Sequence, residues 1–101
     1  MKHFILFYDY VPDYLERRAP LRAAHFAHAR SFEARGELFI GGACTDEGPP
    51  LAVIVFKVAD RKIVEDFARA DPYVVHGLAT RWYVREWTTV IGRDALTTVP
   101  F

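Results

Sequence analysis

Short apolar runs and longer amphipathic segments alternate along this 101-residue chain. Four of the runs are rich in aromatic and β-branched residues and are bounded by turn residues, a pattern typical of strands. The second and third runs are separated only by a polar turn segment, so we expect them to pair as an antiparallel hairpin. The four predicted strands span His3–Tyr10, Glu37–Ala43, Leu51–Val58 and Thr80–Val90.

A long amphipathic segment separates the first two strands. From Asp13 to Arg35 the chain is rich in Ala, Arg, Leu and Glu, and Gly36 then provides a C-terminal stop. Pro20 has no amide proton for a hydrogen bond in a helix interior. We therefore expect an opening turn over Tyr14–Arg18 and a main helix that begins near Pro20.

A second helix is expected from Asp60, a suitable N-cap, to about Ala70, where Asp71-Pro72 breaks the pattern. Residues 91–101 carry no clear signal. The predicted order β-α-β-β-α-β is that of a ferredoxin-like α+β fold, with one antiparallel sheet and two helices on one face. The length supports a single domain over residues 1–101.

The predicted sheet has apolar residues on both of its faces. Phe4–Tyr8 and Leu51–Phe56 are apolar at successive positions, whereas strands with one face in water alternate between apolar and polar residues. The chain has no further element long enough to cover the second face, and an exposed apolar sheet is an association site. We therefore expect a homodimer whose two sheets pack face to face.

Composition and charge narrow the classes of partner. Thirteen Lys and Arg residues balance thirteen Asp and Glu residues, so the chain lacks the basic surface that nucleic-acid binding requires. It also lacks an apolar stretch that approaches the length of a membrane span and a small-residue cleavage site near its N-terminus. We expect a cytoplasmic protein with neither nucleic acid nor a membrane as a partner.

The sequence also lacks the usual signals for a cofactor or a metal. Cys44 has no Cys or His partner at metal-ligand spacing and is interpreted as a small apolar residue at a strand end. The Gly41-Gly42 pair lies in a predicted strand rather than in a phosphate-binding loop. We therefore expect no nucleotide cofactor and no metal ion.

The main helix carries the most informative polar residues. His25 falls near the middle of its apolar face with Arg18 and Arg22 beside it, while His28 falls at the margin. A polar side chain in such a position needs a hydrogen-bond partner or a cavity. From spacing alone, His25 is equally a core histidine bonded to a backbone carbonyl or a site residue. For the two arginines, the spacing favours side chains that extend their charged ends to the sheet edge over a role in a site.

Asp71 is the second candidate. It precedes a proline, so its backbone is biased toward extended geometry and its side chain can point away from the helix. One interpretation is a turn-forming Asp-Pro pair. The other is a carboxylate that orients an imidazole for acid/base chemistry, although spacing alone does not bring Asp71 to His25. His3 and His76 are expected to face solvent or lie in loops.

Six short segments together span nearly the whole chain: Tyr8–Tyr10, Arg18–Phe26, Gly36–Gly42, Ala70–Tyr73, Gly77-Leu78 and Trp87. In this order they resemble the YciI-related family. The resemblance implies the dimeric α+β barrel fold, similar to muconolactone isomerase and the antibiotic-biosynthesis monooxygenases. It also implies a site built from the helix histidine and the Asp-Pro aspartate, here His25 and Asp71. The chain departs from the family in having Ala43, where proline often follows the Gly-Gly pair.

Three functional hypotheses follow. The first is a cofactor-free enzyme that isomerises or eliminates a small, aromatic-derived or lactone-like substrate, with His25 as acid or base, Asp71 as its orienting carboxylate and Arg22 as a clamp for an anionic group. The second is a non-catalytic module that binds a small ligand, and the third is a structural dimer without a pocket. Tyr8, Asp9, Arg18 and Trp87 are further candidates for lining the same cavity.

Overall fold

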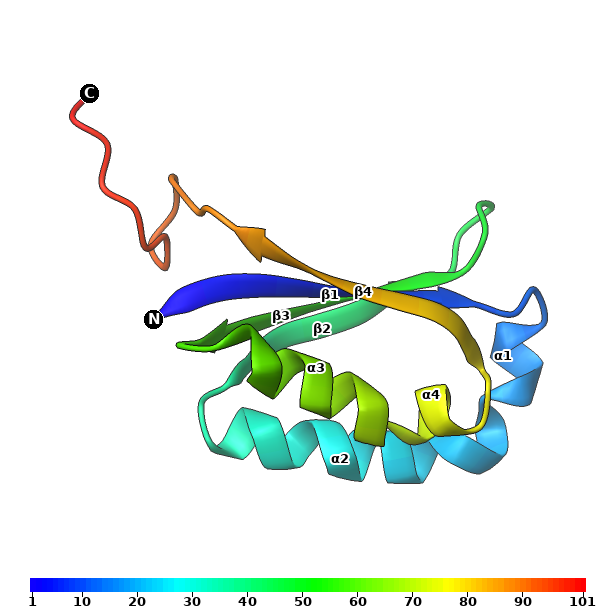
Figure 1. Ribbon diagram of the computed structural model, residues 1–101. Coiled ribbons are helices and arrows are strands. Elements are labelled where there is room, and N and C mark those ends of the chain that lie inside the picture. The colour runs from blue at the N-terminus through cyan, green and yellow to red at the C-terminus, as the bar shows by residue number, and fades with distance from the viewer.

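The four apolar runs form one antiparallel sheet in a computed structural model that describes residues 1–101 (Figure 1). The order of the strands across the sheet is β2-β3-β1-β4, so the first strand lies in the middle next to the last. This arrangement confirms the predicted ferredoxin-like topology. The strands are β1 (Lys2–Tyr10), β2 (Leu38–Cys44), β3 (Leu51–Val58) and β4 (Ala79–Trp87).

All helices lie on one face of the sheet (Figure 1). Pro20 sits in a 3₁₀ turn, as expected from its missing amide proton, and the main helix begins directly after that turn. A short helix after Asp71 was not predicted, because the sequence signals there indicated only a loop. The helices are α1 (Tyr14–Arg17), the 3₁₀ turn η1 (Ala19–Leu21), α2 (Arg22–Ala34), α3 (Arg61–Ala70) and α4 (Pro72–Val75).

The last strand is shorter than its sequence pattern indicated. The aromatic and β-branched pattern predicted a strand as far as Val90, but β4 ends at Trp87. Trp87 pairs with His3, which lies one residue from the start of β1. The neighbouring strand therefore offers almost no further backbone groups, and the ladder ends for lack of a partner.

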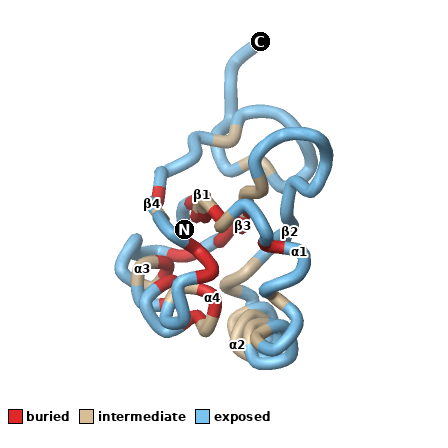
Figure 2. The backbone as a smooth tube through the Cα atoms, turned by 90° about the vertical axis from the view of Figure 1, so that its right-hand side faces the viewer, coloured by how far each residue is buried: buried red, intermediate tan, exposed pale blue.

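The two long helices cover the sheet unequally. Val64, Phe67 and Ala68 of α3 are fully buried against the sheet, whereas α2 has no fully buried residue. Figure 2 shows the same contrast, with red segments around β1, β3, α3 and α4 and only tan or pale blue along α2. The hydrophobic core therefore lies beneath α3, and α2 stands over a less filled part of the sheet.

Small residues explain the space beneath α2. Gly41 and Ala43 of β2 and Ala52 of β3 lie on the sheet face that looks toward this helix, and all three line a cleft there. A Cβ atom on Gly41 would lie 3.3 Å from the side chain of Ile54, which is tighter than ordinary packing. Side chains this short cannot reach α2, so the cleft stays open.

The opposite face of the sheet carries apolar side chains that no helix covers. Ile5 and Phe7 of β1 alternate with the residues that point into the core, and Val53 and Val55 occupy equivalent positions on β3. The rings of Phe7 and Tyr83 stack on this face with centroids 4.9 Å apart. The apolar character expected for both faces is confirmed, and the homodimer inferred from it stays a prediction.

His3 is buried, which corrects the expectation that it faces solvent. Only 4% of the residue is exposed, because the segment after β4 folds back toward it and the hydroxyl of Thr89 lies 2.8 Å from Nδ1. Burial, followed by the positive charge of Lys57, lowers the pKa of His3 below its ordinary value of 6.5.

No helix in the chain is both long and apolar enough to cross a membrane.

Candidate active site

Asp71 lies at the junction of α3 and α4 and has no exposed surface. The following proline excludes helical geometry, so the backbone is extended (φ −66°, ψ 125°) and turns the side chain back under α4. There Oδ1 accepts a hydrogen bond from the backbone N–H of Tyr73 at 3.0 Å, which caps the short helix. The Asp-Pro pair therefore ends one helix, begins the next and fixes the carboxylate inside the protein.

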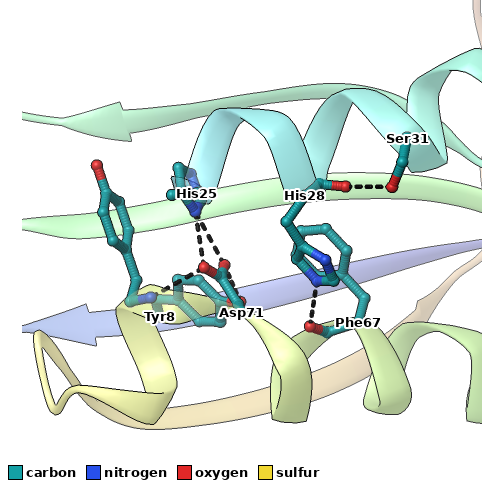
Figure 3. Close-up of polar contacts among 7 residues, drawn as sticks. Tyr8, His25, His28, Ser31, Phe67 and Asp71 are labelled. Atoms are coloured by element: carbon teal, nitrogen blue, oxygen red, sulfur yellow. Dashed lines mark hydrogen bonds and ion pairs between the residues drawn. The ribbon is translucent and has the colours of Figure 1, made fainter. Parts of the chain in front are cut away.

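Two further side chains complete the surroundings of this carboxylate. The hydroxyl of Tyr8, from β1, donates to Oδ2 at 2.7 Å. His25, from α2, places Nδ1 at 2.8 Å from Oδ1 and 3.0 Å from Oδ2 (Figure 3). Burial, and then the charge of Asp71, raises the pKa of Tyr8 far above its ordinary value, so its hydroxyl stays protonated as a donor. The Asp71 carboxylate therefore has three hydrogen-bond donors, which meets the need of a buried carboxylate for partners.

The hydrogen bond to Asp71 sets the tautomer of His25. A carboxylate accepts, so Nδ1 carries the proton and Nε2 is left with a lone pair, an assignment that follows from the hydrogen-bond network. Nε2 has no hydrogen-bond partner within the chain, and 13% of the side chain is exposed. The ring of Tyr73 lies flat against the imidazole, with centroids 3.8 Å apart and planes 4° apart. The imidazole is therefore held in one orientation with one nitrogen available.

His25 lines a cleft of about 610 Å³ between α2 and the β2–β3 side of the sheet. This volume is in the range of sites for small organic ligands. The small residues Gly41, Ala43 and Ala52 form part of its floor, while aromatic side chains and the arginines of α2 line the rest. The aromatic residues at the cleft are Tyr10, Tyr14, Phe26, Phe39 and Tyr73.

The charge in the cleft is mainly positive. Arg18, Arg22 and Arg30 line it together with a single acid, Glu33. None of the three arginines forms a salt bridge, although five other arginines of the chain do. Arg22 and Arg30 rest over the ring of Phe26, at 5.0 Å and 5.5 Å from its centroid. Unpaired guanidinium groups around a partly apolar cleft favour a small anionic ligand.

The structure brings together most of the residues predicted from sequence. His25 and Asp71 are in direct contact, and Arg18 and Arg22 line the same cleft. Tyr8 reaches the site through Asp71 and is itself fully buried.

Two predicted residues are not at the cleft. Asp9 is 3.7 Å from Arg81 in a salt bridge, and Trp87 pairs in register with His3. Both lie on the sheet face that points away from α2. Adjacent residues of a strand point to opposite faces, so Tyr8 and Asp9 cannot serve the same cavity. The prediction that Asp9 and Trp87 line the cavity with His25 is therefore not supported by their placement.

His28 contacts helix α3 and does not line the cleft. Its Nε2 lies 2.9 Å from the backbone carbonyl of Phe67, one of the carbonyls near the C-terminal end of α3. Its ring also stacks on that of Phe67, with centroids 4.5 Å apart (Figure 3). His28 therefore ties α2 to α3, while His25, one turn earlier, lines the cleft.

No group of three or more His, Cys, Asp or Glu side chains is arranged to hold a metal ion.

Sequence reasoning missed Tyr73, which packs on His25, and the stacked pair Tyr10 and Tyr14, which also line the cleft. Tyr73 follows the Asp-Pro pair directly, so the Asp-Pro-Tyr turn contained the signal. The contact between Tyr73 and His25 depends on the short helix α4, which directs the ring of Tyr73 toward α2.

Comparisons with known proteins agree with this architecture. The YCII-related domain matches residues 1–88 of the chain. An uncharacterised protein of Haemophilus influenzae is 27% identical over 84 residues, covering 75% of this chain and 86% of that protein. Among solved structures, the 5-chloro-2-hydroxyhydroquinone dehydrochlorinase TftG of Burkholderia phenoliruptrix, in complex with 2,5-dihydroxybenzoquinone, superposes with a TM-score of 0.75. It is 21% identical, with 87% of this chain and 95% of that chain covered.

Fold and site together define an α+β protein in which a helix histidine meets a buried aspartate beside an arginine-lined cleft. The chain belongs to the YCII-related domain family. This confirms the resemblance drawn from the sequence segments.

Proposed function

We propose that the protein is a cofactor-free acid/base enzyme that isomerises or eliminates a small, aromatic-derived or lactone-like substrate. The observation that carries this proposal is the pairing of His25 Nδ1 with both oxygens of Asp71, which leaves Nε2 as the free nitrogen of a residue that lines the cleft. An imidazole held in one tautomer by a carboxylate is suited to proton transfer near neutral pH.

Each residue has a defined part in this chemistry. Nε2 of His25 takes a proton from the substrate, and the electron pair of the broken bond forms a new double bond. In an elimination the leaving group departs with its bonding electrons, whereas in an isomerisation the imidazolium returns the proton to another atom. Asp71 stabilises the imidazolium, and Arg22 and Arg18 hold the negative charge that develops on the substrate. The similarity in fold to TftG, a dehydrochlorinase, supports an elimination as the reaction.

A homodimer is part of the proposal. The sheet face opposite the helices presents Ile5, Phe7, Val53 and Tyr83, which are only partly covered, and two such faces packed together would bury these side chains. The cleft lies on the opposite side of the sheet, between the sheet and α2, so packing of the sheets leaves it accessible.

The experiment measures proton abstraction directly. The full chain is incubated in deuterated buffer with 5-chloro-2-hydroxyhydroquinone and with muconolactone, and deuterium incorporation and chloride release are followed. The proposal expects turnover that falls by about 10²–10⁴-fold in His25→Gln and Asp71→Asn. His28→Gln is the matched control, because His28 lies on the same helix and outside the cleft.

Two results would contradict the proposal. The first is wild-type turnover that persists in His25→Gln. The second is binding of these compounds without exchange or elimination, which would favour a module that binds a small ligand without transforming it.

A further inference from the structure

The hydroxyl of Tyr73 has no hydrogen-bond partner. It is the one buried side-chain nitrogen or oxygen in the chain that lacks a partner, and only 1% of the residue is exposed. Buried polar groups are almost always paired, so an unpaired one requires an explanation. One explanation is that the Tyr73 hydroxyl forms its hydrogen bond only when a ligand is bound.

The position of Tyr73 supports this explanation. Its side chain lines the cleft, and its ring is stacked on the imidazole of His25. Burial raises the pKa of Tyr73, whereas the positive charges of Arg22 and Arg18 oppose the shift. The phenol is therefore a protonated donor within the field of two guanidinium groups. A donor beside two cations is suited to an anionic oxygen.

The two arginines are free to join such a ligand. Arg22 forms no salt bridge and lies over the ring of Phe26. Arg18 is bound only to its neighbour one turn earlier, since it donates to the hydroxyl of Tyr14 at 3.3 Å. Neither guanidinium is neutralised by a carboxylate, and both line the same cleft as Tyr73.

We propose that the Tyr73 hydroxyl, Arg22 and Arg18 form an anion subsite that binds a carboxylate or phenolate oxygen of the substrate. The inference rests on the proposed function, because it places the bound molecule beside Nε2 of His25. It narrows the substrates to small organic acids and acidic phenols or enols. It also makes Tyr73 a binding residue whose hydroxyl has no role in holding the free protein together.

Binding is measured by titration calorimetry on the full chain with three probes. Benzoate measures the binding of a carboxylate, and the enolate of 2,5-dihydroxybenzoquinone measures the binding of a phenolate-like oxygen. Benzamide is the neutral counterpart of benzoate. We expect Tyr73→Phe to weaken binding of at least one anion by about tenfold or more, the usual effect of losing one charge-assisted hydrogen bond. Arg22→Gln should weaken it similarly, and benzamide should bind more weakly than benzoate.

Tyr83→Phe is the matched control, because it removes a hydroxyl on the opposite sheet face and should leave anion binding unchanged. Thermal unfolding separates a binding role from a structural one. Tyr73→Phe removes an unpaired buried hydroxyl, so the midpoint of the free protein should stay constant or rise. A fall in the midpoint would identify a structural hydroxyl and overturn the inference.

Three binding results would also overturn the inference. They are unchanged binding of both anions to Tyr73→Phe, equal binding of benzoate and benzamide, and no binding of either anion to the wild type at millimolar concentration. These outcomes are independent of the deuterium exchange that tests His25. The subsite can therefore fail while the acid/base function stands, and the reverse also holds.

Discussion

The hydroxyl of Tyr8 and the carboxylate of Asp71 meet at 2.7 Å although the two residues are 63 positions apart in the sequence. One comes from the central strand β1 and the other from the turn between α3 and α4. This contact joins the sheet to the helix layer at the point where His25 also reaches the carboxylate. The site is therefore fixed from three directions.

Removing this hydroxyl tests how much the contact stabilises the protein. Tyr8→Phe keeps the ring and deletes one donor to a buried carboxylate, so the free energy of unfolding should fall by about 1.5–3 kcal/mol. Denaturant unfolding measures the change, with Tyr83→Phe as a control that has no hydrogen-bonded hydroxyl. An unchanged free energy of unfolding in Tyr8→Phe would show that Asp71 does not need this donor.

The two histidines of α2 should separate stability from chemistry. His28→Gln loses the stacking on Phe67 and disturbs the hydrogen bond to its carbonyl, so we expect a loss of about 1 kcal/mol of stability. Ligand binding in the cleft should be unaffected. His25→Gln should abolish exchange activity, and it should also lower the unfolding midpoint because it removes one of the three donors to the buried carboxylate of Asp71. Equal effects of the two variants on activity would contradict the separate roles.

The uncovered sheet face predicts the oligomeric state. Sedimentation equilibrium at micromolar concentration should give twice the chain mass of 11.6 kDa. Val53→Arg places a charge in the centre of that face and should yield the monomer. Leu15→Arg, at an exposed apolar position on α1, should leave the dimer intact. A wild-type protein that sediments as a stable monomer would refute face-to-face packing.

His3 predicts a loss of stability on acidification. Its folded pKa lies below 6.5, so between these two values the unfolded chain binds more protons than the folded chain. The free energy of unfolding should therefore fall as the pH drops from 6.5 through the folded pKa. His3→Gln should reduce this slope, while His76→Gln, at an exposed position, should preserve it. A slope that is identical in wild type and His3→Gln would exclude His3 as its source.

The sequence predicted the sheet well because strand patterning is local. Apolar residues at successive positions of Phe4–Tyr8 marked a strand that is covered on one face by helices and apolar on the other. Strand and helix ends were less certain, since they depend on partners elsewhere. The strand predicted to Val90 stops at Trp87 because β1 has no further residues to pair with it.

The candidate site was only partly accessible to sequence reasoning. His25 and Asp71 lie 46 positions apart, and their contact depends on how α2 packs beside α4, which no spacing rule provides. The family resemblance supplied that pairing. Strand periodicity is a sequence signal that separates Asp9 from the site, because the two-residue period of a strand puts it on the face opposite Tyr8. The role of Tyr73 required the three-dimensional contact with His25.

The tautomer of His25 tests the central claim most directly. Long-range proton–nitrogen spectra of the full chain are recorded at mildly alkaline pH, where a free imidazole is neutral, and His25→Gln assigns the signals. The proposed site predicts a protonated Nδ1 bound to Asp71 and an unprotonated Nε2 that is available as a base. A proton fixed on Nε2 would contradict the proposal, because the nitrogen at the cleft would then be unable to accept one.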